Sequence, residues 1–450
     1  MNREKGNLPA SATADRREAI LKAAISQGLL HPEEALAAAF IDMDGVAENV
    51  AALHREFSAI PQVLHAFAAK ANCLVPALAA LKDLDMGCEV ASEGELAQAI
   101  AAGFPPARIV FDSPAKTVRE LRQALSLGVA INADNFQELD RIAELLERSP
   151  STSTIGVRIN PQVGVGGIEA MSTAGATSKF GVALNDEGSR SRLLNAYRQY
   201  PWLTSVHAHV GSQGCPLSLI TEGISRAVEF ADEVNAVVGR DRISTIDIGG
   251  GLPVDFETDD LISPFGSYVQ ALRHEVPALF NGRYSVITEF GRTIMAKFGF
   301  IAAHVEYTKE AGGQRIAITH AGAQVAMRTV FLPEVWPVRV VAHDGSGRIK
   351  GGDLVPQDVA GPCCFAGDLV AKNRLLPVLE QGDIVALLDT GSYYFSTPLS
   401  YNSLPEPGVY GATVEVDGTV RFSTLRLPQT IPDLLERSGA SQLPVPAVLP

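Results

Sequence analysis

The sequence has few cysteines, lacks long apolar runs, and carries fewer basic than acidic residues. Its five cysteines form no Cys-x-x-Cys pair, which argues against a disulfide framework or a structural zinc site. No stretch is long and apolar enough to cross a bilayer, and the N-terminus has no apolar core of signal type. We therefore expect a cytoplasmic protein that does not bind membranes.

The excess of acidic residues narrows the possible partners. With 37 Lys and Arg against 51 Asp and Glu, the net charge is -14, so a general nucleic-acid binder is not expected. A local basic pocket for a phosphate is still compatible with this charge. The 450 residues include 46% hydrophobic and 20% charged residues, which is typical of a globular chain long enough for two domains.

Short apolar runs alternate with segments of helical periodicity over roughly 250 residues. The runs predict strands at residues 63–69, 87–91, 108–111, 129–132, 155–159, 205–210, 244–248 and 285–288. Helical segments between them include 93–102, 118–127, 136–147 and 219–238. About eight such units predict an α/β fold, a (β/α)8 barrel of TIM type. A doubly wound open sheet is the alternative, which the absence of a Gly-x-Gly-x-x-Gly motif disfavours.

The pattern changes after residue 295. Apolar runs separated by Gly, Pro and Asp turns predict strands at 301–307, 314–319, 338–341, 384–388, 411–416 and 420–424. Little helical periodicity lies between them, so a mostly antiparallel β-barrel or sandwich domain is expected at 296–450. The tail at 427–450 contains five prolines and is predicted to be irregular.

Lys70 ends the first apolar strand of the barrel segment, in the stretch VLHAFAAKAN. Partial exclusion of its ammonium from water would lower its pKa and make the amine a usable nucleophile. The alternative is a lysine whose stem is apolar and whose head stays in water.

Polar residues follow the other strands at the ends where a barrel of this kind carries its active site. Gly249, Gly250 and Gly251 can present backbone amides to an anion, although such a run also suits a flexible turn. Ser212 offers a hydroxyl and Arg292 a guanidinium to the same anion.

Two further polar groups at strand ends have more than one interpretation. Glu289 is either an ion-pair partner of Arg292 or an acid for a ring nitrogen. His209 could ligate a metal together with His207, because His-x-His on a strand shares a face, but no third ligand is evident and no metal is expected. A flat imidazole stacked on a heteroaromatic ring is the favoured interpretation.

A lysine, a phosphate cradle and an acid together describe a site for pyridoxal 5'-phosphate. The lysine forms a Schiff base, the cradle holds the phosphate, and the acid keeps the pyridine nitrogen protonated. The electron-poor ring then stabilises the carbanion that remains when CO2 leaves an amino acid.

The chain resembles the barrel-type (fold type III) pyridoxal phosphate-dependent decarboxylases of diaminopimelate, ornithine and arginine. The pattern is closest to the diaminopimelate enzymes. The matching segments occur in family order over nearly the whole chain and include FAAKAN (67–72), CEVASEGEL (88–96), VRINP (157–161), HAHVGSQ (207–213), IDIGGGL (246–252), EFGR (289–292), GPCCFAGD (361–368) and DTGSYYFS (389–396).

The resemblance implies a role for each matching position. Lys70 would be the Schiff-base lysine, His209 would stack on the cofactor ring, and Glu289 would bind the pyridine nitrogen. The remaining cofactor-binding positions would be Arg158, Ser212, Gly249, Gly250, Gly251, Gly291, Arg292 and, from the β domain, Tyr393.

The resemblance also implies a homodimer with shared active sites. Cys364 of one subunit would protonate the carbanionic intermediate in the other. Residues 1–44 would join the C-terminal β domain, leaving 45–295 as the cofactor-binding barrel.

The sequence departs from the family pattern at positions where the family enzymes bind the distal end of the substrate. Phe365 replaces the usual acid after the cysteine, Leu404 replaces a basic residue, and His320 replaces an aspartate. A distal ammonium would be buried there without a partner, which costs about 3–5 kcal/mol. Arg328 and Arg374 remain for a carboxylate. An amino acid with an apolar, aromatic or conjugated side chain is therefore the substrate we expect.

Three alternatives stay open at this point. The enzyme could decarboxylate diaminopimelate or a basic amino acid, it could be an amino-acid racemase, or it could be an inactive regulatory homologue. Glu289 speaks against the racemase, because racemases of this barrel type usually place an arginine at the ring nitrogen. The intact lysine and phosphate cradle speak against an inactive protein.

Overall fold

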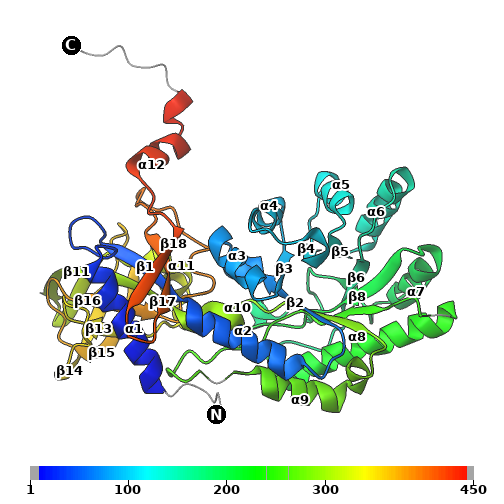
Figure 1. Cartoon of the computed structure of the whole chain (residues 1–450), viewed down its shortest axis with the longest axis horizontal. Helices are drawn as coiled ribbons and strands as arrows, with labels where there is room; N and C mark the ends of the chain where they lie inside the picture. Colours follow the sequence, from blue (N-terminus) through cyan, green and yellow to red (C-terminus); the bar gives the residue numbers. More distant parts are fainter. Residues whose placement is uncertain (1–9, 240, 262, 443–450) are drawn as a thin grey trace. The chain divides into compact units, whose positions relative to one another are not determined.

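A computed structural model describes residues 10–239, 241–261 and 263–442, which form two compact units (Figure 1). The barrel unit comprises residues 46–255 and 262–295. The β unit comprises the described parts of 1–45, 256–261 and 296–450. Each unit is built around its own sheet.

The sheet of the barrel unit contains eight parallel strands that close on themselves. Their order is β5-β4-β3-β2-β10-β9-β8-β6, and a further β5–β6 pairing completes the ring. The strands are β2 (Val63–Ala68), β3 (Gly87–Val90), β4 (Ile109–Asp112), β5 (Ala130–Ala133), β6 (Ile155–Asn160), β8 (Leu203–His207), β9 (Thr245–Asp247) and β10 (Ser285–Thr288). The short β7 (Val182–Ala183) pairs with β6 outside the ring. The predicted TIM-type barrel is confirmed.

Side-chain caps fix where several helices of the barrel unit begin. Ser92 accepts the amide of Glu95, and Asn135 accepts the amide of Glu138. Thr117 and Glu120 form a reciprocal capping box, which satisfies two amides that have no partner inside the helix. The helices are α2 (Met43–Phe57), α3 (Val75–Asp83), α4 (Glu93–Ala101), α5 (Val118–Leu127), α6 (Phe136–Arg148), α7 (Ser189–Gln199), α8 (Leu217–Val238), α9 (Phe265–Glu275) and α10 (Arg292–Met295).

One strand ends earlier than its sequence pattern predicts, and this changes the position of a site residue. The apolar run 205–210 predicts a strand through Val210, but β8 ends at His207. The carbonyl of Val210 instead accepts the amides of Thr173 and Ala174 from another loop, at 3.0 and 3.1 Å. The prediction that His207 and His209 share a strand face is therefore wrong, and His209 lies in the following loop.

The β unit is a mostly antiparallel sheet with the order β15-β14-β12-β11-β1-β17-β18, to which β16 and β13 are added through β11. Its strand β1 (Ala37–Asp42) pairs antiparallel with β11 and parallel with β17. The other strands are β11 (Gly299–Ala311), β12 (Gln314–Thr319), β13 (Val340–His343), β14 (Leu354–Ala360), β15 (Leu369–Pro377), β16 (Ile384–Leu388), β17 (Gly408–Val414) and β18 (Val420–Arg426).

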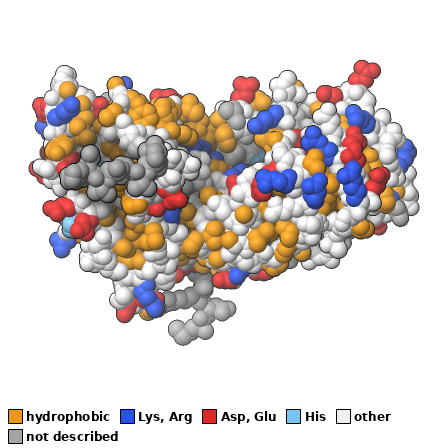
Figure 2. All heavy atoms as spheres, turned by 90° about the horizontal axis from the view of Figure 1, so that it is seen from above, with side chains coloured by type: hydrophobic (Ala, Val, Ile, Leu, Met, Phe, Trp, Pro, Cys, Tyr) orange, Lys and Arg blue, Asp and Glu red, His pale blue; other side chains and the backbone are white. Residues whose placement is uncertain are grey.

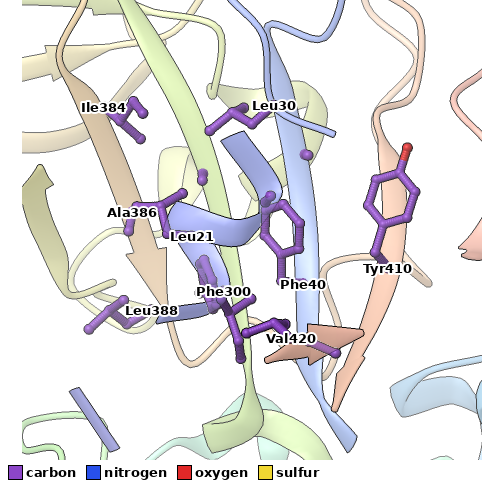
Figure 3. Close-up of a cluster of buried hydrophobic side chains, with 14 residues drawn as sticks. Leu21, Leu30, Phe40, Phe300, Ile384, Ala386, Leu388, Tyr410 and Val420 are labelled. Atoms are coloured by element: carbon purple, nitrogen blue, oxygen red, sulfur yellow. The ribbon is translucent and has the colours of Figure 1, made fainter. Parts of the chain in front are cut away.

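Helix α1 (Ala10–Ser26) supplies apolar side chains to the core of the β unit. Leu21 lies in one buried cluster with Phe40 of β1, Phe300 of β11 and Leu388 of β16 (Figure 3). The Phe40 and Phe300 ring centroids are 5.2 Å apart, so aromatic packing joins the two central strands.

The β unit also contains helices in segments where the sequence predicts none. Helix α11 (Ala323–Phe331) follows β12. Helix α12 (Ile431–Arg437) interrupts the tail that was predicted to be irregular, because Thr430 and Asp433 form a capping box at its start. Residues 443–450 of that tail lie outside the described residues.

Opposite charges alternate on the outer helices of the barrel unit. Figure 2 shows basic and acidic side chains interspersed on one face of the molecule. One ion pair between these helices joins Arg119 of α5 to Glu93 of α4. None of the helices in the described part of the chain is long and apolar enough to cross a membrane.

Candidate active site

Lys70 lies just past the carboxyl end of β2, in a single 3-10 turn (Ala69–Ala71). Its Nζ is 2.6 Å from Oε2 of Glu89, which comes from the neighbouring strand β3 and is fully buried. Burial raises the pKa of Glu89, although the positive charge of Lys70 opposes this effect. The amine of Lys70 therefore faces a carboxylate that is able to take up a proton.

Glu289 follows β10 at the same end of the barrel and is 3% exposed. Its Oε2 lies 3.9 Å from Nε2 of His207, and its Oε1 has no hydrogen-bond partner among the described residues. Burial, followed by the charges of Asp247 and Glu89, raises the pKa of Glu289 well above its usual value. A buried acid of this kind suits a ligand that presents a basic nitrogen.

His209 presents a neutral ring to the same region. Its Nδ1 accepts the amide of Gly250 at 3.2 Å, so the remaining ring proton belongs on Nε2. Burial and the nearby charges of Arg158 and Lys70 hold the pKa of His209 well below its usual value. The side chain is thus a flat, uncharged surface.

The glycine loop after β9 packs backbone against backbone. A Cβ on Gly250 would lie 2.1 Å from the carbonyl oxygen of Glu289, and one on Gly251 would lie 1.8 Å from that of Gly211. Gly251 also has φ +94°, a conformation that favours glycine. Gln213 joins the loops after β8 and β9, because its side chain bonds both the amide and the carbonyl of Val254, at 3.0 and 2.8 Å.

Ser212, Gly291 and Arg292 complete this end of the barrel. Ser212 lies half-buried in the loop after β8, and Arg292 is buried at the start of α10. A Cβ on Gly291 would lie 2.9 Å from the Cβ of Ala71, so this backbone passes directly beside the lysine turn. Amides, a hydroxyl and a guanidinium are the donors that a phosphate needs. These residues fit pyridoxal phosphate, with Lys70 for its aldehyde and Glu289 for its ring nitrogen.

Arg158 of β6 is held by two side chains. Its Nη1 is 2.7 Å from Oδ2 of Asp112, and its guanidinium lies 4.4 Å from the ring centre of Phe180. Burial acts to raise the pKa of Asp112, but Arg158 and His207 overcome this and lower it. Arg158 thus neutralises a buried carboxylate beneath the site.

One group of described residues has the spacing of metal ligands. Asp112, His207 and Glu289 place one ligand atom each within 4.8 Å of one another. Arg158 already occupies the Oδ2 of Asp112, so we interpret this group as a network of charges rather than an ion site.

In the β unit, aromatic rings flank Arg328. Its guanidinium lies 3.5 Å from the ring centre of Trp336 and 5.1 Å from that of Tyr393. Tyr393 has φ +63°, which is unusual for a bulky residue and typical of functional loops. Arg374 donates from Nη2 to the carbonyl of Val338 at 3.2 Å.

Cys364 is exposed in the loop between β14 and β15, and its amide donates to Asn402 Oδ1 at 2.7 Å. The adjacent Phe365 stacks on Phe331, with ring centres 5.6 Å apart at 5°, and packs edge-on against Tyr401 at 5.4 Å. Leu404 lines a cavity of about 260 Å³ with His320 and Tyr410.

Several buried residues beside the site lack a motif that would reveal them. Asp112 ends the plain apolar strand β4, and Asn132 of β5 donates to Asp247 Oδ2 at 3.0 Å. Glu89 lies in the matching segment CEVASEGEL (88–96), which by itself assigns it no role. The one available signal was a charged residue inside an apolar strand.

Comparisons with known proteins agree with this geometry. Residues 44–296 match the model of the pyridoxal binding domain of pyridoxal-dependent decarboxylases. A diaminopimelate decarboxylase of Helicobacter pylori is 32% identical over 341 residues, covering 76% of this chain and 81% of that protein. The Zymomonas mobilis enzyme of the same name is 30% identical over 373 residues, covering 83% and 85%.

Solved structures give the same result. The crystal structure of Helicobacter pylori diaminopimelate decarboxylase with L-lysine superposes with a TM-score of 0.78 at 27% identity, covering 91% of this chain and 98% of that one. Pyridoxal phosphate is accordingly the cofactor of this protein, and amino-acid decarboxylation is its reaction. The chain belongs to the pyridoxal-dependent decarboxylase family.

Proposed function

We propose that this enzyme decarboxylates diaminopimelate or a basic amino acid at its α-carbon, with Lys70 holding the cofactor. The relatives that carry the name diaminopimelate decarboxylase support this substrate better than the apolar substrate expected from Phe365 and Leu404. The convergence of Lys70, Glu289 and the glycine loop at one end of the barrel carries the proposal.

The site residues of the barrel unit each have a defined role in this proposal. Ser212, the glycine loop, Gly291 and Arg292 bind the phosphate, and His209 supports the ring. Bound pyridoxal phosphate supplies an electron-poor ring that takes up the electron pair left behind by CO2. Glu289 shares its proton with the ring nitrogen, and burial helps to keep that proton in place.

Glu89 has a separate role, which is to accept a proton from Lys70. An ammonium must lose a proton before its nitrogen can attack an aldehyde. Oε2 of Glu89 lies 2.6 Å from Nζ of Lys70 and has a raised pKa because of burial, so it is placed to accept that proton.

Residues of the β unit would act in a homodimer with shared sites. Exposure of the Cys364 thiol supports its proposed task, which is to return a proton to the substrate carbon in the partner's site. Tyr393 would close the phosphate site. Arg328, oriented by Trp336 and Tyr393, is suited to a distal carboxylate such as that of diaminopimelate.

A specific observation favours a second candidate substrate. Phe365 stands where the resemblance places an acid, and it forms an aromatic cluster with Phe331 and Tyr401. This cluster suits an amino acid whose side chain ends in an apolar or aromatic group. The racemase and the inactive homologue receive no support from the relatives.

CO2 release from a panel of amino acids tests the substrate. The panel contains meso-diaminopimelate, lysine, ornithine, arginine, phenylalanine and tryptophan, and Lys70→Ala serves as the inactive control. We expect meso-diaminopimelate to have the highest kcat/KM. Turnover of only the aromatic amino acids would reject this substrate in favour of the second candidate.

Phe365→Glu tests the same point from the side of the protein, with Phe365→Leu as the matched apolar control. If the substrate carries a distal ammonium, the new carboxylate should raise kcat/KM about tenfold, because a desolvated charge pair is worth more than 1 kcal/mol. An equal loss in both variants would instead indicate that the aromatic ring itself binds substrate.

A further inference from the structure

His207 is buried among carboxylates that come from different strands of the barrel. Its ring is fully buried, with Nδ1 3.1 Å from Asp247 Oδ2 and Nε2 3.5 Å from Asp112 Oδ2. Nε2 is also 3.9 Å from Glu289 Oε2. The other charged or titratable groups around this cluster include Arg158, Lys116, Lys70, His209, Glu89 and Asp134.

The two ring nitrogens cannot both be satisfied by a neutral imidazole. A neutral ring has one N–H and one lone pair, whereas both nitrogens of His207 face carboxylate oxygens. Neither ring nitrogen makes a regular hydrogen bond within the described residues, so charge attraction is the main stabilising effect available. A protonated ring carries a positive charge between the carboxylates and turns no lone pair toward either of them.

The balance of charge around the cluster also favours a protonated His207 ring. Asp112, Asp247 and Glu289 are all at most 6% exposed, and Arg158 neutralises only one of them. Unpaired buried carboxylates are costly, and one cation at the centre of the group reduces that cost for all three.

Asp247 connects this cluster to the phosphate loop. Its Oδ1 accepts the amide of Gly249 at 3.0 Å, while its Oδ2 accepts Asn132 and faces His207. One carboxylate thus fixes both the glycine loop and the ring that touches Glu289.

We propose that His207 is a positioning residue, a buried imidazolium that lets Glu289 give its proton to the cofactor nitrogen and holds Glu289 in register with the phosphate loop. This inference rests on the proposed role of Glu289. Without the cation, an ionised Glu289 would face the like charges of Asp247, Glu89 and Asp112, which the charge of Lys70 opposes only in part. Glu289 would then keep its proton, and the pyridine ring of the cofactor would not become positively charged.

His207→Gln tests this role, because glutamine keeps hydrogen-bonding capacity but cannot carry a charge. With cofactor labelled at the ring nitrogen, the 15N chemical shift should move from the pyridinium range toward that of neutral pyridine. We expect kcat to fall about tenfold or more with KM nearly unchanged, as is usual when a partner behind a functional group is lost. His54→Gln, at a half-buried histidine whose Nε2 lies 3.1 Å from the carbonyl oxygen of Leu84, is the matched control.

Asp247→Asn provides a second variant that tests the link to the loop. It should weaken cofactor binding as well as shift the ring-nitrogen signal, since it alters the contacts of that carboxylate with Gly249, Asn132 and His207. Wild-type ring-nitrogen shift and kcat in His207→Gln would overturn the proposal.

Neutron diffraction of the wild-type holoenzyme gives an answer that does not depend on any variant folding. We expect deuterium on both Nδ1 and Nε2 of His207, and a single occupied nitrogen would overturn the inference. The CO2-release panel distinguishes this outcome from a failure of the proposed function. If the proposed function is wrong, no amino acid in the panel releases CO2, although neutron diffraction can still show deuterium on both nitrogens of His207.

Discussion

The glycine loop shows how little space the site leaves for change at a single residue. Gly250 needs no positive φ, yet a Cβ there would meet the carbonyl of Glu289 at 2.1 Å. The reason for glycine at this position is close packing of two backbones, not conformational freedom.

Gly250→Ala should therefore weaken cofactor binding at least tenfold and cost about 1–3 kcal/mol of stability, because the two backbones must move apart. Fluorescence titration of the apoenzyme with pyridoxal phosphate and chemical denaturation would measure both effects. Gly94→Ala in α4 is the control, since the nearest atom to its Cβ would be Ser92 Oγ at 3.7 Å. Equal behaviour of the two variants would show that the loop is not a tight cradle.

Two adjacent cysteines of the β unit should respond differently to substitution. Cys364 is exposed, so Cys364→Ser should leave the free energy of unfolding within about 0.5 kcal/mol of wild type. If its thiol donates a proton to the substrate carbon, kcat should fall about a hundredfold.

Cys363 is the contrasting neighbour. It is buried, its Sγ is 3.6 Å from Gln324 Oε1, and burial raises its pKa to about 11. Cys363→Ser should lower stability while leaving kcat nearly unchanged. The proton-donor role of Cys364 would be rejected if the two variants lost activity equally in steady-state assays.

At the scale of elements, the barrel could be read from the sequence because its strands are nearly continuous apolar runs. All residues of β3 and β4 are buried, which is the pattern that a parallel sheet covered on both faces predicts.

Strand β14 (Leu354–Ala360) could not be predicted from an apolar run. Its Gln357 and Asp358 are buried, because Gln357 donates to the carbonyls of Leu376 and Pro377 and Asp358 accepts the amide of Asn373. These partners all lie in β15, so the stretch resembles a polar turn until the fold is known.

Helix α1 gives the β unit a testable packing contribution. Leu21 is fully buried against the sheet, so Leu21→Ala should cost about 2–5 kcal/mol through lost contacts and a residual cavity. Guanidinium unfolding followed by circular dichroism would measure this loss. Leu427→Ala, at a leucine that is 73% exposed, is the control and should cost almost nothing. A loss as small as the control would mean that α1 packs only loosely.

At the scale of the whole molecule, each unit contains a buried histidine that makes stability sensitive to acid. Burial and then the nearby His54 lower the pKa of His65 to about 3. Burial and then Arg17 lower the pKa of His343 to about 4. An unfolded chain binds these protons below about pH 6.5, whereas the folded units do not, so stability falls as the pH falls from 6.5 toward those values.

Between pH 7 and pH 5, each of these histidines should remove about 2 kcal/mol from the free energy of unfolding. His65→Gln cannot titrate and should reduce the loss by that amount, as measured by denaturant unfolding at the two pH values. His274→Gln, at an exposed histidine, should leave the loss unchanged. An unchanged loss in His65→Gln would show that His65 is protonated in the folded protein.

The site was predictable where a residue belongs to a strand-end motif, as with Lys70, His209 and Glu289. The role of a site residue was not predictable where the residue meets its partners only after the barrel has closed. Asp112 and His207 come close because closure of the ring through β5 and β6 brings β4 and β8 near each other, and no local pattern encodes that distance. The substrate is a separate case, because Phe365, Leu404 and His320 are isolated replacements in three different segments, whereas the relatives match over most of the chain.

The central claim is that the amine of Lys70 carries the cofactor. Borohydride reduction of the loaded enzyme, followed by digestion and mass spectrometry, would locate the modified lysine. We expect a pyridoxyl group on Lys70 alone, and its loss in Lys70→Arg. Modification of another lysine, such as Lys116 or Lys179, with an unmodified Lys70 peptide would contradict it.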